Sequence, residues 1–395
     1  MRKSQFPFAV LTAIAALGCS SRGLAGDPGV TDTEIVIGAH TNESGALADK
    51  MPLLLSMYFD DVNAAGGIHG RKIKFIRYDG AYVVSRAVEN TKKLVEQDKI
   101  FAMVAAVPSI SHQAVWKYLV QKGVPDVFFG DALKIYGEPF QRLLFPMVPE
   151  IGVDGATAAK YLAPQMGGKK VCFIAVNSET GIQYAEGAKK AFEEFNKTAD
   201  AKAKVAIGPM EKVERDSVNS NPQMLNLKRE KCDAIFASVF QAAWAQQVNF
   251  AWDQNFKPQW VTWLYNGKGF IFNLIKEPAR DGIITTQQTL RDPRGPDDKV
   301  WKEVEAFAEK HNVKDAISSV PVAFWVGEAF TEALKRAGRD LTREKLITAL
   351  ESMGGWQCKV CLMPMDLSPT NHWPFLKPKV VNWRNGKLTM IEKQP

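Results

Sequence analysis

Histidine and cysteine are scarce in this chain, and their arrangement narrows the chemistry that it can carry out. The 395 residues include five histidines and five cysteines. The histidines are His40, His69, His112, His311 and His372. Their spacing matches no metal-ligand motif and no arrangement with a nucleophile. No Gly-x-Gly-x-x-Gly or phosphate-loop pattern follows an expected strand either, because Gly66, Gly67 and Gly70 come after an expected helix. The sequence therefore gives no support to an enzyme, and no metal or cofactor is expected.

A strong excess of charge is also missing, as are long apolar runs after the N-terminus. The formal charge of +7 includes three basic residues in a segment that we expect to be removed, which lowers the charge to +4. That excess is too small and too dispersed to predict nucleic-acid binding. No segment after the first 25 residues is apolar enough to cross a membrane.

The first residues have the layout of a secretory signal peptide. An apolar run at 8–17 follows two basic residues, and small residues lead to Ala25. This order predicts that residues 1–25 are a signal peptide and that the mature protein is periplasmic. An alternative stays open, because the three residues that end at Cys19 resemble a lipoprotein cleavage site, which would give a lipid anchor there.

Export would place the cysteines in an oxidising compartment, which changes their interpretation. Cys358 and Cys361 stand close together in WQCKVCLMP, and we predict a structural disulfide between them. Free thiols, and zinc or redox chemistry, are the alternatives. Cys172 and Cys232 lie at expected strands, and we interpret them as buried, inert thiols.

Residues 62–79, VNAAGGIHGRKIKFIRYD, contain the clearest structural signal. Apolar residues recur at helical spacing up to Ala65, the next two glycines end that helix, and an extended segment follows. Strands and helices alternate to about residue 145, and the alternation restarts after 146–152, with one expected strand at 205–210. This predicts an α/β fold of two similar domains with parallel sheets. An Asn-Gly turn between VVNW and LTMI predicts a C-terminal hairpin.

Three segments carry a resemblance to a known family: IVIGAHTNESG, DDVNAAGGIHGRKIKFIRYD and AVENTKKLVEQDKIFAMVAAVPS. They resemble the Leu/Ile/Val-binding family of periplasmic solute-binding proteins, which serve ATP-driven importers, and the resemblance extends from about residue 33 to the C-terminus. It implies two Rossmann-like domains joined by a three-strand hinge, with the ligand cleft between them. By analogy, the chain crosses between domains near residues 146, 288 and 361. The N-terminal lobe would comprise 27–146 and 288–361, and the C-terminal lobe 147–287 and 362–395.

Polar loops are expected where the parallel strands end, which is where such sheets bind ligands. Residues 41–45 follow the first strand, Ser109 and Ser111 follow the third, and residues 130–132 follow the fourth. Serine hydroxyls and free N–H groups at the start of a helix suit a carboxylate. The alternative is that Ser109 or Ser111 is simply a helix N-cap.

The resemblance implies roles for some of these residues in the first domain. It implies that Ser109 holds the carboxylate of the ligand and that Gly130, Asp131 and Ala132 contact it from the next loop. The chain departs from the family at Ala132, where a threonine is expected.

In the second domain, the implied ligand positions are Thr180, Phe240 and Tyr265. The family has an aromatic residue near Thr180, and near Tyr265 it has an acidic residue that pairs with the ammonium group of an amino acid. A buried ammonium without a carboxylate is costly, so Tyr265 argues against an α-amino acid unless Asp131 or Glu43 replaces the acid. Six aromatic residues of the two domains otherwise suggest an apolar or aromatic ligand, and core packing is their alternative role. They are Phe128, Phe129, Phe240, Trp244, Trp263 and Tyr265.

Together these observations predict a monomeric, periplasmic substrate-binding component of an ABC importer. It would close around a small organic solute and deliver it to the membrane permease subunits. The family default for the solute is a branched-chain or other amino acid, and the alternative is an amine-free aromatic or apolar acid or amide. A ligand sensor that controls a partner receptor is a further alternative, although such a sensor would normally carry an output domain or a transmembrane helix.

Overall fold

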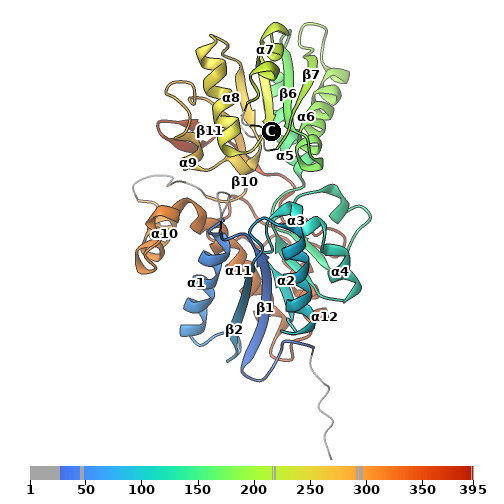
Figure 1. Ribbon diagram of the computed structural model, residues 1–395, viewed down its shortest axis with the longest axis vertical. Coiled ribbons are helices and arrows are strands. Elements are labelled where there is room, and N and C mark those ends of the chain that lie inside the picture. The colour runs from blue at the N-terminus through green and yellow to red at the C-terminus, as the bar shows by residue number, and fades with distance from the viewer. Residues whose placement is uncertain are drawn as a thin grey trace, which may run out of the picture.

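The structure, a computed structural model, describes residues 27–44, 49–215, 217, 219–290, 292, 297–392 and 394. Its elements form two lobes, each built on one sheet, which short segments of chain join (Figure 1). The predicted α/β fold with two domains is confirmed. The predicted signal peptide at 1–25 and Cys19 lie outside the described residues. Within the described part of the chain, no helix combines the length and the apolar character that a membrane span requires.

Five parallel strands form the sheet of the N-terminal lobe, in the order β2-β1-β3-β4-β5. They are β1 Glu34–Thr41, β2 Lys72–Asp79, β3 Ala102–Val104, β4 Asp126–Phe129 and β5 Leu144–Pro146. The helices of this lobe are α1 Met51–Ala64, α2 Val84–Glu96, α3 Ser109–Gln113, α4 Trp116–Gln121, α10 Lys299–Lys310, α11 Val320–Ala337 and α12 Arg343–Glu351. Helix α1 packs on α11, and α11 packs on α12. Segments far apart in the sequence therefore share one lobe.

The predicted glycine turn joins α1 to β2. Gly66 and Gly67 have φ angles of 107° and 71°, in the region that only glycine adopts without strain. A Cβ on Gly67 would lie 2.0 Å from the carbonyl oxygen of Arg71, so the turn has no room for a side chain there. Strand β2 then pairs in parallel with the whole of β1. The helix, turn and strand predicted at residues 62–79 are thus confirmed.

The C-terminal lobe contains a seven-stranded sheet in the order β12-β11-β10-β9-β8-β6-β7. Its strands are β6 Lys170–Val176, β7 Ala206–Val213, β8 Ala234–Ser238, β9 Gln259–Thr262, β10 Ile284–Gln287, β11 Lys379–Arg384 and β12 Lys387–Met390. Its helices are α5 Ile151–Leu162, α6 Glu179–Thr198, α7 Asn221–Arg229, α8 Gln241–Asp253 and α9 Gly269–Phe272. Strands β6 to β10 pair in parallel, whereas β11 is antiparallel to β10 and to β12. The predicted hairpin is confirmed, with Asn385 and Gly386 in its turn.

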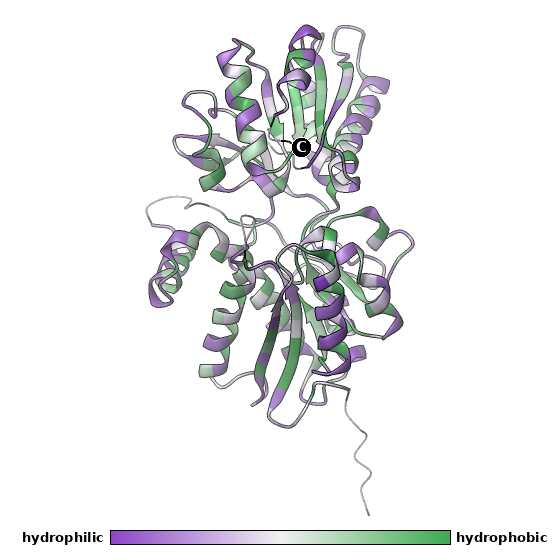
Figure 2. Cartoon of the chain, viewed as in Figure 1, coloured by the Kyte–Doolittle hydropathy of each residue, from purple (hydrophilic) through white to green (hydrophobic). Residues whose placement is uncertain are grey.

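Apolar residues concentrate in the strands, and polar residues lie mainly on the outer faces of the helices (Figure 2). Every residue of β4 and of β8 is buried. Complete burial is typical of parallel strands that helices cover on both faces. Apart from Asp126 and Ser238 at their ends, these two strands consist of apolar residues, and most polar side chains lie in the loops beyond such strands.

Helices α5 and α6 pack so closely that glycine is required on both. A Cβ on Gly155 of α5 would lie 2.2 Å from the carbonyl oxygen of Tyr184, and a Cβ on Gly187 of α6 would lie 2.1 Å from that of Gly152. The contact holds the first turn of α5, with the fully buried Asp154, against α6.

The segment that leads from β10 to the N-terminal lobe lies beside residues 360–362. The Leu290 N–H donates to the Val360 carbonyl at 2.8 Å, and the Leu362 N–H donates to the Gln288 carbonyl at 2.9 Å. Residues 147–150 also link β5 of the N-terminal lobe to α5 of the C-terminal lobe, and residues 377–378 lead from the N-terminal lobe to β11. Three connections of this kind restrict the relative motion of the lobes to a hinge rotation.

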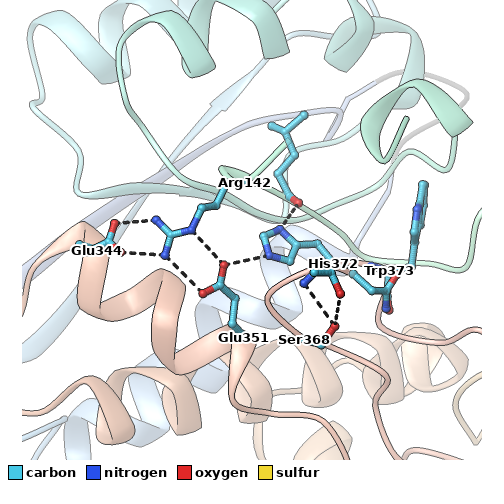
Figure 3. Close-up of polar contacts among 9 residues, drawn as sticks. Arg142, Glu344, Glu351, Ser368, His372 and Trp373 are labelled. Atoms are coloured by element: carbon cyan, nitrogen blue, oxygen red, sulfur yellow. Dashed lines mark hydrogen bonds and ion pairs between the residues drawn. The ribbon is translucent and has the colours of Figure 1, made fainter. Parts of the chain in front are cut away.

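Residues 363–376 return to the N-terminal lobe before the chain reaches β11. The Nδ1 of His372 lies 3.1 Å from the Leu144 carbonyl oxygen. Glu351 of α12 contacts His372 at 3.4 Å and Arg142 at 3.1 Å (Figure 3). These partners all belong to the N-terminal lobe. We therefore propose that the segment at 362–378, which the resemblance placed in the C-terminal lobe, belongs to the N-terminal lobe.

Two disulfides join Cys172 to Cys232 and Cys358 to Cys361. The second confirms the predicted pair. The first shows that the interpretation of Cys172 and Cys232 as inert thiols was wrong. Cys172 lies in β6 and Cys232 lies just before β8, and these strands are neighbours in the sheet although 60 residues separate the two cysteines. Only the order of the strands reveals this proximity.

Replacing both Cys172 and Cys232 with alanine should lower the free energy of unfolding by about 4 kcal/mol, because the disulfide closes a loop with a separation of 60 residues. The same change at Cys358 and Cys361, which are three residues apart, should cost only about 1.5 kcal/mol. Urea unfolding of the two double variants measures both losses. Equal losses would contradict the explanation by loop closure.

Candidate functional site

The loops after the parallel strands of the two sheets face one another between the lobes, and we call them the interlobe region. The contacts that cross it include a cation–π contact and a hydrogen bond. The guanidinium carbon of Arg215, after β7, lies 4.1 Å from the ring centre of Tyr82, after β2. The Lys134 N–H, after β4, donates to Gln183 Oε1 of α6 at 3.1 Å. The interlobe region comprises residues 42–44, 80–83, 108–111, 130–134, 177–183, 214–215, 239–240 and 263–265.

Ser109 begins α3, directly after the end of β3. The N-cap of this helix is Pro108, and no side chain caps it, so the N-cap alternative for Ser109 and Ser111 was wrong. Ser109 is half-buried and its Oγ lies 3.5 Å from Nε2 of Gln113, whereas Ser111 is buried. The hydroxyl proton of Ser109 therefore remains available to a solute.

Asp131 is fully buried in the loop after β4. The Tyr136 hydroxyl donates to its Oδ2 at 2.6 Å, and the Gln113 amide nitrogen lies 3.4 Å from the same oxygen. The Ala132 N–H donates to Oδ1 at 2.8 Å. All three donors are neutral, and no cationic side chain of the described residues pairs with this carboxylate.

The residues on either side of Asp131 contribute backbone only. The Gly130 N–H donates to the Ala106 carbonyl at 2.8 Å, and the Ala132 carbonyl accepts from the Ile151 N–H at 2.9 Å. The second bond attaches the first residue of α5 to this loop. Where the family has a threonine hydroxyl, Ala132 offers only a methyl group.

Thr180, Phe240 and Tyr265 reach the interlobe region from the C-terminal lobe. Thr180 is buried in the first turn of α6, and Phe240 directly precedes α8. Tyr265 lies in a short turn of 3₁₀ helix, Leu264–Asn266. The rings of Phe240 and Tyr265 lie 4.8 Å and 5.4 Å from that of Trp263, measured between ring centres. Trp263 is fully buried, whereas Phe240 and Tyr265 are half-buried, and we call these three rings the apolar wall.

The Tyr265 hydroxyl is enclosed and has no hydrogen-bond partner among the described residues. Burial raises its pKa well above the usual range, and the negative charges of Asp131 and Asp154 raise it further. The hydroxyl is therefore a neutral donor that a bound solute can satisfy. A carboxylate, which the resemblance implies at this position, is not available here.

Glu43 is already paired. The guanidinium of Arg77 donates to its Oε2 at 2.5 Å, and the Glu43 N–H donates to Asp79 Oδ1 at 3.0 Å. Because its charge is compensated, Glu43 is a weaker partner for an ammonium group than Asp131 is.

Several aromatic and histidine candidates belong to the core instead. Phe128 and Trp244 are fully buried. His112 stacks on Phe129, and its Nε2 lies 2.7 Å from the buried Asp126. Burial lowers the pKa of His40 to about 3, so that this residue is neutral. These side chains pack in the core next to the loops of the interlobe region.

Arg215 and Tyr82 are not among the site residues predicted from the sequence. Both follow strands, so both lie where ligand-binding residues are expected, just after a parallel strand. We call this expectation the strand-end rule. The strand expected at 205–210 in fact continues to Val213, which moves Arg215 from the interior of a long loop to the end of β7. Tyr82 follows β2, whose loop was not considered.

Asp154 is a third buried carboxyl group near this site. The Leu264 N–H donates to its Oδ2 at 3.0 Å, and the Thr286 hydroxyl donates to its Oδ1. Burial raises the pKa of Asp154 to about 7, although both hydrogen bonds oppose the shift.

Comparison with known proteins identifies the family. The family described as "Periplasmic binding protein" matches residues 34–387. The chain belongs to this family. It is 29% identical over 165 residues to an amino acid binding protein of Pseudomonas aeruginosa, a match that spans 42% of each chain. It is 24% identical over 283 residues to the Leu/Ile/Val-binding protein of Escherichia coli, covering 71% of this chain and 72% of the other.

Solved structures agree on the fold. A branched chain amino acid ABC transporter structure from Thermus thermophilus, with bound valine, superposes with a TM-score of 0.80 at 13% identity, covering 92% of this chain and 97% of the other. At this identity the likeness shows the fold alone. The family and the fold predicted for this periplasmic binding protein are confirmed. The ligand-binding roles remain predictions, and no group of three or more His, Cys, Asp or Glu among the described residues is placed to hold a metal.

The buried Asp154 should make this periplasmic binding protein less stable as the pH rises from about 4 to about 7, since its pKa is 3.8 when unfolded and about 7 when folded. The unfolded chain releases this proton first, so the total loss is on the order of a few kcal/mol. Asp154→Asn should remove that part of the pH dependence. Urea unfolding at pH 4 and pH 8 measures it, with Asp60→Asn on the exposed face of α1 as the control. Equal pH dependence in Asp154→Asn and the unmodified protein would contradict the assignment.

Proposed function

We propose that this protein is the extracytoplasmic substrate-binding component of an ABC importer. In this role it closes around one small organic solute in the interlobe region and presents it to permease subunits in the membrane. The observation that carries the proposal is that the carboxyl ends of the parallel strands of two sheets meet across a three-segment hinge, with buried polar groups left unsatisfied there. Family membership and the names of both curated relatives support it.

The solute that we propose first is an amino acid with an apolar side chain, of the branched-chain type. The two relatives are named for binding amino acids or Leu, Ile and Val. The apolar wall of Phe240, Trp263 and Tyr265 suits such a side chain. Asp131 supplies a carboxylate that can replace the missing acid at Tyr265, since Glu43 is occupied by Arg77.

The second candidate is an amine-free aromatic or apolar acid or amide. Tyr265 favours it, because a tyrosine hydroxyl can donate a hydrogen bond to a carboxylate or an amide but cannot neutralise an ammonium group. The two candidates differ in one functional group, so they can be separated by experiment.

The periplasm is the compartment that we propose for the mature protein. Two disulfides within one chain are typical of proteins outside the cytoplasm, where thiols are not kept reduced. The signal peptide proposed at 1–25 would direct this export, and Cys19 would add a lipid anchor if it is modified.

Mass spectrometry of the solute that copurifies with the protein should detect an apolar amino acid. Isothermal titration calorimetry against leucine, isoleucine, valine, phenylalanine and benzoate should then show binding by at least one amino acid with a dissociation constant of about 10 μM or tighter, typical of the affinity of hydrogen-bonded, closed sites. Tighter binding of benzoate than of every amino acid would support the amine-free candidate. A protein that binds none of these probes and copurifies with no solute would contradict the proposed function.

Ser109→Ala should weaken solute binding by about ten-fold or more, because the hydroxyl would lose a hydrogen bond to a charged group of the solute. Ser56→Ala on α1, away from the interlobe region, is the matched control and should leave the affinity unchanged. Calorimetry with the solute found above measures both variants. An unchanged affinity of Ser109→Ala would show that this hydroxyl does not contact the solute.

A further inference from the structure

The interlobe region contains two opposite charges that have no partner of opposite sign among the described residues, and they belong to different lobes. Asp131 provides the negative charge from the N-terminal lobe, and Arg215 provides the positive charge from the C-terminal lobe. A ligand that fills the space between the lobes will meet both charges.

Arg215 is half-buried and contacts only aromatic rings. Its guanidinium carbon lies 4.1 Å from the ring centre of Tyr82 and 5.7 Å from that of Phe240, and it makes no hydrogen bond or ion pair with any of the described residues. Contacts of this type use the charge and the flat face of the guanidinium. Its N–H donors lie in the plane of the group, so they remain free to bind a carboxylate with two parallel hydrogen bonds.

Asp131 has no compensating cation in the described part of the chain. Its three donors are a hydroxyl, a side-chain amide and a backbone N–H, and the side chain is fully buried. Burying a carboxylate without a cation is unfavourable, and an ammonium group supplied by a ligand would remove that cost.

Tyr265 connects the two charges. Its hydroxyl has no hydrogen-bond partner among the described residues, and both Asp131 and Tyr82, whose ring Arg215 contacts, raise its pKa. Asp154 also faces this hydroxyl, but two donors already occupy its oxygens. The unsatisfied hydroxyl of Tyr265 is therefore associated with a carboxylate, with the ring that contacts Arg215 and with the apolar wall.

We propose that the ligand is a zwitterion that lies across the interlobe region with its ammonium group on Asp131 and its carboxylate on Arg215. This assignment rests on the proposed function, and it makes Arg215 a residue that determines specificity. The orientation is the reverse of the one that the resemblance implies, in which the N-terminal lobe holds the carboxylate and the C-terminal lobe holds the ammonium.

The position of Ser109 supports the reversal. The amide nitrogen of Gln113 lies 3.5 Å from Ser109 Oγ and 3.4 Å from Asp131 Oδ2, so these two groups are close neighbours. A ligand carboxylate on Ser109 would be repelled by Asp131. An ammonium group there would be attracted by Asp131 and could also donate to the Ser109 oxygen. An amino acid with an apolar side chain meets all of these requirements.

The test uses two series of probes, each with one carbon skeleton and different charges. The first series is leucine, 4-methylpentanoate and 3-methylbutylamine, and the second is phenylalanine, 3-phenylpropionate and 2-phenylethylamine. In calorimetry the unmodified protein should bind the amino acid of at least one series more tightly than both matched analogues. Asp131→Asn should weaken the binding of that amino acid by roughly thirty-fold or more, so that it binds no more tightly than the matched acid. Arg215→Gln should weaken the binding of the amino acid by a similar factor, so that it binds no more tightly than the matched amine.

The controls are Asp60→Asn and Arg336→Gln, which change the same charges away from the interlobe region and should leave all affinities unchanged. Thermal unfolding confirms that each variant is folded. Binding of an amino acid that Arg215→Gln or Asp131→Asn leaves unchanged would overturn this inference and leave the proposed function standing. Tighter binding of a matched acid or amine than of the amino acid would overturn it as well. No binding of any of the six probes would overturn the inference, and the proposed function would then be judged by the copurified solute.

Discussion

Parallel pairing of the strands is the constraint on which the rest of this molecule depends. When β1, β3 and β4 run in one direction, their carboxyl ends lie along one edge of the sheet, and the same holds for β6, β8 and β9. The strands are largely buried on both faces, so few polar side chains lie within them, and most polar groups gather in the loops at that edge. The hinge then places the two edges opposite each other. A binding site between the lobes follows from pairing direction and burial before any individual side chain is considered.

Much of this architecture could be predicted from short-range patterns. The helix, the two glycines and the strand at residues 62–79 are local features, because helical spacing, positive φ and extended backbone are each decided by neighbouring residues. The strand-end rule also located Ser109 and Asp131 in the right loops. It failed for Arg215 because the expected end of β7 was three residues too early, and a change of that size decides whether a side chain lies inside a strand, at its end or in a loop.

Features that depend on which elements become neighbours could not be predicted. The disulfide between Cys172 and Cys232 requires β6 to lie beside β8, and the sequence around either cysteine contains no information about that order. The state of Glu43 is a similar case, since its pairing with Arg77 depends on the register between β1 and β2. The same limit applies to Asp131. Its lack of a cation is a property of everything packed around it, and only the folded chain shows that the negative charge is uncompensated.

The contact between Arg215 and Tyr82 is too weak to hold the lobes together by itself. A cation–π contact at a partly exposed position contributes about 0.5–1 kcal/mol. Shifting a hinge from mostly open to mostly closed requires about 5.5 kcal/mol of differential binding. A solute that bridges Asp131 and Arg215 would add charged hydrogen bonds on both lobes, and these exist only when the lobes are close. The two charges therefore affect the opening and closing of the hinge as well as the choice of solute. Their burial is unfavourable without the solute, so the empty protein is biased towards opening, and the same charges draw the lobes together once a zwitterion lies between them.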